Sequence, residues 1–595
     1  MVVDINILAS SDVHGYYMPW DYSMDKPYEK GSLAQISTEV EKQRGLYKNT
    51  ILIDAGDMFQ GNCSELFCED DIHPAIVAMN EIGYDIWEMG NHEYGYGIKN
   101  LQRFIDEFNG EVIGGNVYKD NKRLHKPYCI IEKEGIKIGF IGLVTSLINK
   151  FEKGTKAMSG IIATDMKHEL ELIEKELKDK VDCIIGVIHA GIDNENNVAN
   201  TGIRDLLKND DKLTAVFCGH FHDIQNFNIG NTTILEPGKF GQAIAKLLLR
   251  FEKSDGNIKL VKKTSEIIPI DASIKPDSEI IKKLNHFHER AVSYSNEEIG
   301  ILINDCMSEK SEISKIPQMR VKQTGITDFF LEVVRHYGNA DVAMIQLDND
   351  NAGINKGIIR RKDINRNYTY VSGGITSYQI TGKVLKKILE YSAYFFNESR
   401  VGDVNISFNY ERQLYKYSSN YFFSNLIYDI DLTSEKRIKN LTYENESPIG
   451  DEDKIIFATT KYTMDILIAN VLSGEVVNKI YSSKDELREQ GSIRNLSCRY
   501  IKEVLKGLVE IKPKNNWKII TAPIEKNIRE IAIKLINQGY ISLINSEDGK
   551  CNIKSVNIYD KVDKFDKGLK KSGIDISRFS TKGELYRYAN SFIFG

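Results

Sequence analysis

The stretch at residues 51–61, Ile-Leu-Ile-Asp-Ala-Gly-Asp-Met-Phe-Gln-Gly, constrains the fold more than any other part of the chain. An apolar run at 51–53 is followed at once by two acids, Asp54 and Asp57, around a turn of small residues. This pattern predicts a buried parallel strand that carries a carboxylate to the rim of a sheet. Asp57 is therefore a candidate site residue, and the same arrangement recurs elsewhere.

The first half of the chain alternates short apolar runs with amphipathic stretches, which predicts an α/β fold with polar chemistry at the strand ends. The runs lie at 5–8, 51–53, 136–144, 183–188, 214–218 and 232–235. Between them, residues 164–180 predict a helix, because apolar side chains recur there at spacings of three and four. Thr164 is its expected N-cap.

A chain of 595 residues exceeds what one core usually supports, so we expect more than one domain. We predict an N-terminal α/β domain at 1–266, a linker helix within 267–296, a second α/β domain at 297–520, and a C-terminal extension at 521–595. Helices are expected at 328–337 and 383–396, and strands within 368–380.

Composition and charge exclude some classes of function. With 42% hydrophobic and 27% charged residues, the chain is typical of a soluble globular protein. The net charge of -6 argues against binding to a nucleic acid polymer. No apolar run reaches membrane-spanning length, so we expect no membrane association. The start of the sequence lacks a signal-peptide pattern and the eight cysteines form no CxxC pair, which predicts a cytoplasmic protein unless a leader was removed.

Polar side chains of metal-binding type follow the predicted strands. Asp12 and His14 form an Asp-x-His pair, and residues i and i+2 at a strand end should point the same way. The other candidates are Asn91, His189, His220 and His222. A single histidine is more often structural than a ligand, but seven such residues at strand ends favour two divalent ions that share Asp57. Mixed imidazole and carboxylate ligands suit Zn, Mn or Fe, and such a pair of ions promotes phosphoryl displacement.

The order DxH, GD, GNH, a lone His and GHxH resembles the calcineurin-like metallophosphoesterases. The resemblance implies a four-layer α/β/β/α sandwich. It assigns Asp12, His14, Asp57 and His222 to one ion, and Asp57, Asn91, His189 and His220 to the other. His92 becomes the catalytic residue, acting as electrophile or general acid toward the leaving oxygen. Gly90 and Gly219 are expected to permit tight turns beneath the ligands, and Asp54 is interpreted as a structural acid rather than a ligand.

The segments GDMFQGN, GNHEYGYG, VIHAGI and EPGKFGQ narrow the resemblance to the 5′-nucleotidase family, and within it to 2′,3′-cyclic-nucleotide 2′-phosphodiesterase/3′-nucleotidase. Many 5′-nucleotidases pair the catalytic histidine with an aspartate three residues later. Here that position is Gly95, and the cyclic-phosphodiesterase branch also tends to lack the acid. His92 then needs another orienting partner, either Glu93 or a backbone carbonyl.

The second domain resembles the 5′-nucleotidase C-terminal domain, most clearly in the helix within 375–394, and in that family it holds the substrate. The resemblance implies Tyr462 and Tyr421 as rings that stack on a base and Arg320 as a phosphate contact. For Phe422, which could also supply the second ring, a core role is equally open. The family's glycine-rich and arginine-bearing motifs are eroded at 350–355 and 460–465.

We therefore expect a metal-dependent phosphoesterase that hydrolyses a small-molecule phosphate ester, a nucleotide by the family resemblance, through attack of a metal-activated hydroxide. The eroded motifs support an alternative, in which the substrate is not a nucleotide and the second domain is an interaction module. A non-enzymatic scaffold is disfavoured, because buried unpaired carboxylates and imidazoles are costly to keep.

Overall fold

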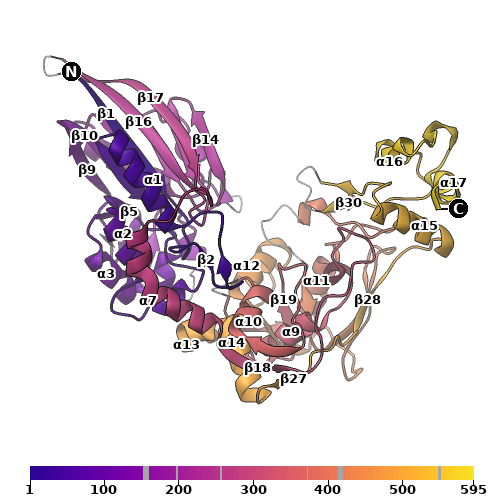
Figure 1. Ribbon diagram of the computed structural model, residues 1–595. Coiled ribbons are helices and arrows are strands. Elements are labelled where there is room, and N and C mark those ends of the chain that lie inside the picture. The colour runs from indigo at the N-terminus through magenta and orange to yellow at the C-terminus, as the bar shows by residue number, and fades with distance from the viewer. Residues whose placement is uncertain are drawn as a thin grey trace. The chain divides into compact units, whose positions relative to one another are not determined.

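The protein is described here as a computed structural model, which covers residues 1–151, 160–195, 198–254, 257–370, 373–412, 420–546 and 551–594. It divides into two compact units, Met1–Glu297 and Glu298–Gly595. Figure 1 shows the elements of each unit along the chain.

Two six-stranded sheets form the centre of the first unit. The first sheet has the order β17 (Asn257–Pro269), β16 (Ala243–Ser254), β1 (Val2–Ser10), β4 (Thr50–Asp54), β5 (Ile86–Glu88) and β6 (Glu111–Ile113). The second has the order β14 (Ile224–Ile229), β15 (Thr232–Pro237), β13 (Leu213–Cys218), β12 (Cys183–His189), β10 (Ile136–Val144) and β9 (Tyr128–Lys133). Each predicted apolar run lies within one of these strands.

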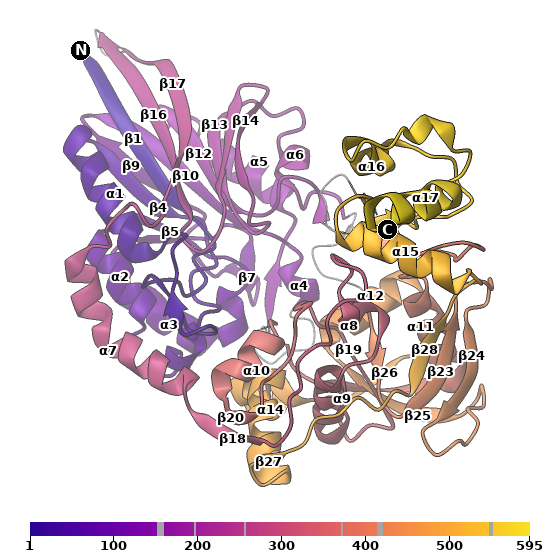
Figure 2. The ribbon, with the colours of Figure 1, turned by 45° about the vertical axis from the view of Figure 1, so that its right-hand side comes forward.

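Alternation along the strands builds the layers, because successive side chains point to opposite faces of a sheet. Ile7, Ile53 and Phe140 belong to one core between the two sheets. Their neighbours Leu8 and Leu52 belong to a core with α1 (Leu33–Leu46), α2 (Pro74–Ile82), α3 (Ile98–Glu107) and α7 (Ser278–Ser295). The neighbouring strand residues of the second sheet pack on α5 (Met166–Leu177) and α6 (Ile203–Leu206) (Figure 2). The predicted α/β/β/α sandwich is confirmed.

Strand direction places the functional segments together. β1, β4, β5 and β6 run parallel to one another, as do β10, β12, β13 and β15. Within each parallel set, the residues that follow the strands therefore leave the sheet at one edge. The pairs Ser10–Asp54 and Val144–His189 are in register at that end.

The helix predicted at 164–180 is α5, and its N-cap differs from the prediction. Asp165 caps it, because its Oδ1 accepts the backbone N–H of His168 at 2.9 Å. Thr164 instead donates its hydroxyl to Glu169 at 2.9 Å. The two candidate cap residues are adjacent, and the carboxylate is the one that reaches the free N–H groups.

The second unit has a five-stranded sheet of order β22 (Phe422–Phe423), β19 (Val342–Ile345), β25 (Lys454–Thr459), β21 (Thr376–Thr381) and β26 (Asn478–Ser482). The helices expected at 328–337 and 383–396 are α9 (Gly325–Tyr337) and α11 (Gly382–Ala393). Residues after 520 form α15 (Lys526–Asn537), α16 (Lys567–Lys571) and α17 (Lys582–Phe594). Ile528 and Tyr586 from this part belong to the same core cluster as Phe330 of α9.

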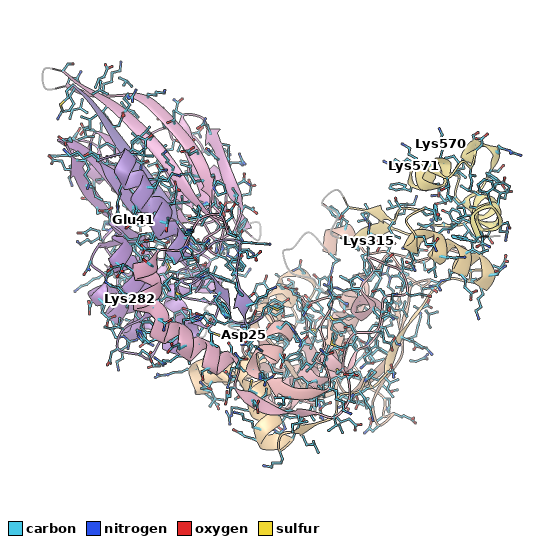
Figure 3. All side chains as sticks on the ribbon, in the orientation of Figure 1. Asp25, Glu41, Lys282, Lys315, Lys570 and Lys571 are labelled. Carbon is cyan, nitrogen blue, oxygen red and sulfur yellow. The ribbon has the colours of Figure 1, made fainter. Side chains whose placement is uncertain are left out.

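Charged side chains cover the outer faces of the helices, as Glu41 on α1 and Lys282 on α7 illustrate (Figure 3). Among the residues that the structure describes, no helix combines the length and apolar character needed to cross a bilayer.

Candidate active site

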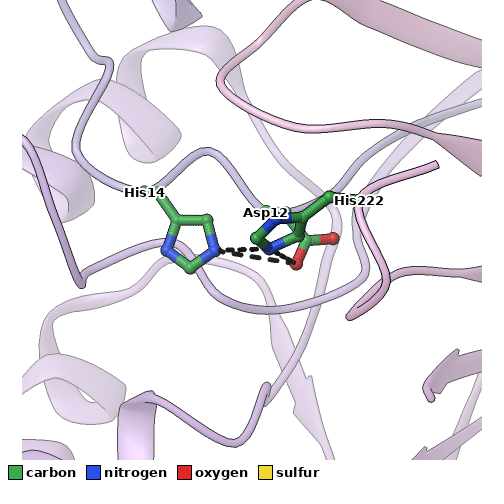
Figure 4. Close-up of side chains that lie close together, drawn as sticks. All are labelled: Asp12, His14 and His222. Atoms are coloured by element: carbon green, nitrogen blue, oxygen red, sulfur yellow. Dashed lines mark hydrogen bonds and ion pairs between the residues drawn. The ribbon is translucent and has the colours of Figure 1, made fainter. Parts of the chain in front are cut away.

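Six of the seven predicted ligands form two clusters at or just beyond the strand ends of the first unit. Asp12, His14 and His222 offer ligand atoms within 4.8 Å of one another, as do Asp57, His189 and His220. In the first cluster, His14 Nε2 lies 3.0 Å from His222 Nε2, and His222 Nε2 lies 3.2 Å from Asp12 Oδ1 (Figure 4). In the second, His189 Nε2 lies 3.2 Å from Asp57 Oδ2.

Asp57 links the two clusters. Its Oδ2 also lies 3.8 Å from His14 Nε2, so one carboxylate faces imidazoles of both groups. Asn91 Oδ1, the seventh predicted ligand atom, lies 3.2 Å from His189 Nε2. The structure thus brings together all seven residues that the sequence singled out.

The reason for the convergence differs from the prediction. β1 ends at Ser10 and β13 at Cys218, so Asp12, His14, His220 and His222 are not strand residues. These four and Asp57 have positive φ values: 51°, 49°, 83°, 64° and 58° for Asp12, His14, His220, His222 and Asp57. Alternating left-handed turns, rather than strand pleating, aim the side chains inward. Asp and His adopt this conformation more readily than most residues.

Gly90 and Gly219 are needed for space rather than for backbone conformation. Neither has a positive φ. A Cβ on Gly90 would lie 2.1 Å from Asp57 Oδ1, and one on Gly219 would lie 1.9 Å from Ser11 Oγ. The prediction that glycines lie beneath the ligands holds, but the turn geometry invoked for them is wrong.

The carboxylate of Glu93 is hydrogen-bonded to backbone N–H groups. Its carboxylate accepts N–H groups from Asp57 (3.0 Å), Met58 (2.7 Å), Phe59 (3.3 Å) and Gly90 (2.7 Å). Four donors on one carboxylate tie the two ligand-bearing turns to each other. Burial and the Asp57 charge nevertheless raise the pKa of Glu93 to about 7.

His92 sits at the edge of the clusters with a third of its side chain accessible. Its backbone N–H donates to Asp57 Oδ1 at 3.0 Å, and its Nε2 lies 3.9 Å from Asp57 Oδ2. Within the described residues its ring nitrogens make no hydrogen bond, so neither Glu93 nor a carbonyl orients the ring. Burial lowers the pKa of His92 to about 4 against the opposing charge of Asp57, which leaves a neutral imidazole at pH 7.

The donor set fits divalent cations. Burial alone would raise the pKa of Asp57, but the charges of His189, His92 and His14 outweigh it and lower that pKa. His14 Nδ1 donates to the Gln60 carbonyl at 2.8 Å, so the Nε2 of a neutral ring carries a lone pair toward His222. A cation is the group that such converging lone pairs and ionised carboxylates accommodate. Asp54, by contrast, is held by Ser10 (2.6 Å) and the Gly56 N–H (3.0 Å), as expected for a structural acid.

One wall of the site was not predicted. Phe240 packs on Tyr16, with ring centroids 4.6 Å apart, and lies 5.9 Å from the ring of His14. Lys239 places its ammonium 4.8 Å from the Phe240 ring centre. Burial lowers the pKa of Lys239, while the charges of Asp12 and Asp223 act in the opposite direction. A lysine directly before an aromatic residue in the EPGKFGQ segment was the available signal, but sequence alone did not show which strand ends lay beside it.

The predicted substrate residues of the second unit are less open than expected. Tyr462, in the first turn of α12 (Lys461–Asn470), is 50% exposed and suits a stacking role. Tyr421 is only 4% exposed and belongs to the core. Arg320 donates to Asp350 Oδ1 at 2.7 Å, and 12% of its side chain is exposed. The core role considered for Phe422 thus applies to Tyr421 as well.

Comparison with known protein families gives two matches. The calcineurin-like phosphoesterase model matches residues 5–223, and the 5′-nucleotidase C-terminal domain model matches residues 299–465. The first range contains all seven predicted ligands, and the second contains Tyr462, Tyr421 and Arg320.

Relatives and solved structures extend the comparison. A 2′,3′-cyclic-nucleotide 2′-phosphodiesterase/3′-nucleotidase of Salmonella typhimurium is 25% identical and aligns with 88% of this chain and 90% of its own length. A trifunctional nucleotide phosphoesterase of Bacillus subtilis is also 25% identical, but the chain spans only 36% of its length. A crystal structure from Staphylococcus aureus, assigned as a 5′-nucleotidase, superposes with a TM-score of 0.72 at 20% identity, covering 87% of this chain and all of that one. The structural likeness establishes the fold.

Proposed function

We propose that the chain is a phosphoesterase that hydrolyses nucleotide phosphate esters, because it matches the calcineurin-like phosphoesterase model and the 5′-nucleotidase C-terminal domain model. The substrates we favour are 2′,3′-cyclic nucleotides and 3′-nucleotides, with 5′-nucleotides as the related possibility. The observation that carries the proposal is the pair of ligand clusters joined at Asp57.

Two divalent ions would be held by these side chains. Asp12, His14 and His222 with Asp57 would hold one, and Asn91, His189 and His220 with Asp57 the other. Zn, Mn and Fe all suit this donor set. When bound, such a pair supplies an activated water at neutral pH and positive charge for the phosphate oxygens.

The chain's own residues supply orientation and a hydrogen-bond donor; with its pKa lowered to about 4, His92 suits the electrophile role expected from the sequence rather than that of a general acid. Glu93 fixes the turn that carries Asp57, so the shared carboxylate does not have to reorganise when substrate binds. The accessible neutral ring of His92 donates an N–H hydrogen bond to a phosphate oxygen or to the leaving alcohol. Lys239 adds a cation beside Asp12 for an anionic group of the substrate.

A substrate panel on the Mn-loaded protein tests the proposal. We expect hydrolysis of bis-p-nitrophenyl phosphate and of 2′,3′-cyclic AMP and 3′-AMP, measured by nitrophenolate absorbance and by chromatography. Asp57→Ala and His220→Ala should lower kcat by at least a hundredfold. A protein that binds Mn yet cleaves none of these esters would refute the proposed activity.

The alternative substrate class is supported by the second unit. Arg320 is paired with Asp350 and Tyr421 is buried, so two of the three predicted nucleotide contacts are already engaged. Tyr462→Ala distinguishes a nucleotide substrate from a non-nucleotide substrate, because loss of one stacked ring costs about 1–3 kcal/mol of binding free energy. A rise in KM of about 5- to 160-fold for 3′-AMP, with bis-p-nitrophenyl phosphate unaffected, supports nucleotides. Cleavage of the aryl ester without any nucleotide turnover favours a non-nucleotide substrate.

A further inference from the structure

The histidines of the two clusters are held from behind by different kinds of acceptor. His14 donates its Nδ1–H to the Gln60 carbonyl at 2.8 Å, and His189 donates its Nδ1–H to the Ala55 carbonyl at 2.6 Å. Each ring thus has one nitrogen fixed by the backbone and turns its Nε2 toward the cluster. This arrangement sets both tautomer and ring plane before any ion binds.

His220 departs from this pattern. Its Nε2 lies 2.9 Å from Oε2 of Glu195, a side chain carried by the loop that follows β12. Because Nε2 donates to this carboxylate, Nδ1 of the neutral ring carries the lone pair, and His220 belongs to the cluster with Asp57 and His189. The acceptor behind His220 is therefore a charged carboxylate rather than a neutral carbonyl.

The loop is braced so that Glu195 does not depend on its own flexible side chain alone. The backbone N–H of Glu195 donates to Thr201 Oγ1 at 2.9 Å. Asn194 accepts the N–H groups of Thr201 (3.1 Å) and Gly202 (2.9 Å), and it donates to Asp205 at 2.7 Å. Only 22% of the Glu195 side chain and 11% of the His220 side chain are exposed. Partial shielding from water strengthens this charged hydrogen bond.

We propose that Glu195 is a positioning residue for the metal site: it locks His220 in the tautomer that offers Nδ1 to an ion, and its charge makes the imidazole a stronger ligand. The inference rests on the proposed metal centre. A carboxylate behind a ligating histidine contributes about 10–100-fold in metal affinity. Because Glu195 acts through His220, which belongs to the Asp57–His189 cluster, the effect falls on one of the two ions.

The test is Mn²⁺ binding to the metal-free full-length protein, followed by calorimetry and by the electron paramagnetic resonance signal of free Mn²⁺. We expect two sites in the unaltered protein. In Glu195→Ala one dissociation constant should rise about 10–100-fold and the other should stay within about twofold. In Glu195→Gln, which keeps an acceptor but not the charge, the same dissociation constant should lie between those of the unaltered protein and Glu195→Ala. Excess Mn²⁺ should restore much of the activity of both variants.

Asp193→Asn is the matched control, because Asp193 lies on the same loop but pairs with Arg204 at 2.9 Å and is 73% exposed. It should bind Mn²⁺ as the unaltered protein does, and the metal-free melting temperatures of all variants should agree. If Glu195→Ala leaves both dissociation constants unchanged, or weakens both equally, Glu195 is not a positioning residue for His220. If the unaltered protein binds no Mn²⁺, the proposed metal centre itself is refuted.

Discussion

The pKa of His73 gives a quantitative test of how the first unit is packed, because two hydrogen bonds fix the protonation state of this residue. Its Nδ1 accepts the N–H of Ala75 at 3.2 Å and thereby caps α2, while its Nε2 donates to the Ser64 carbonyl at 3.2 Å. The ring is fully buried against Phe59 and Phe104. A second proton on Nδ1 would break the cap, and burial lowers the pKa of His73 from 6.5 to about 3.

The lowered pKa makes stability fall as the pH falls. Between pH 6.5 and about 3 the unfolded chain binds a proton at His73 that the folded chain does not, so acidification favours unfolding. From these two values, the free energy of unfolding at pH 5 should be about 2 kcal/mol lower than at pH 8 because of this residue alone. For a unit of this size that corresponds to roughly 4 °C in melting temperature.

The perturbation is His73→Asn, because asparagine keeps an N-cap acceptor but does not titrate. We expect the variant to be less stable at pH 8, and its deficit relative to the unaltered protein to shrink by about 2 kcal/mol at pH 5. Tryptophan fluorescence in a Trp517→Phe background reports on the first unit, since Trp20 and Trp87 are then the remaining tryptophans. Chelator in every sample removes metal-linked pH effects. An equal deficit at both pH values would show that the pKa of His73 is not lowered.

Two further predictions concern one lysine in each unit. Lys239→Met removes a half-buried ammonium beside Asp12. It should therefore raise KM for the dianion p-nitrophenyl phosphate by up to about tenfold more than for the monoanion bis-p-nitrophenyl phosphate. Equal effects on both esters would exclude Lys239 as an anion contact. Lys582→Met should destabilise the second unit by about 3–5 kcal/mol, because it leaves the buried Asp566 carboxylate without the ammonium 3.3 Å away, whereas the exposed Lys570→Met should leave the melting temperature unchanged.

The strand core and the convergence of the predicted ligand residues were predictable from the sequence for a physical reason. Strands buried on both faces read as continuous apolar runs, and parallel strands release their following residues at one edge. The run ending at Asp54 and the run ending at His189 therefore indicated both the fold and the meeting point of the side chains. Burial and strand direction were enough to predict both.

The remaining features depend on contacts between distant segments. Glu195 lies six residues beyond His189 in a loop without periodicity, and its relation to His220 arises only when β12 and β13 pair. The sequence correctly indicated that Gly90 and Gly219 must be glycine. The close approach that requires glycine there, however, involves Asp57 and Ser11 of other segments. Tyr421 has the residue type of a stacking ring, but residue type does not tell whether a ring lies in the core or at the surface.

The ligand turns show why the chemistry of the first unit is more robust than its substrate choice. Left-handed backbone at a residue other than glycine costs about 1–3 kcal/mol, and five of the predicted ligands adopt it. Hydrogen bonds between the two turns offset that cost: Asp12 N–H to the Gly56 carbonyl at 2.8 Å, and His14 N–H to the Asp57 carbonyl at 3.1 Å. These hydrogen bonds join backbone groups within one unit, so they persist when side chains elsewhere change. Under the proposed function, substrate choice instead depends on individual side chains such as Tyr462. Divergence in this chain should therefore alter the preferred substrate before it abolishes the proposed phosphoester hydrolysis.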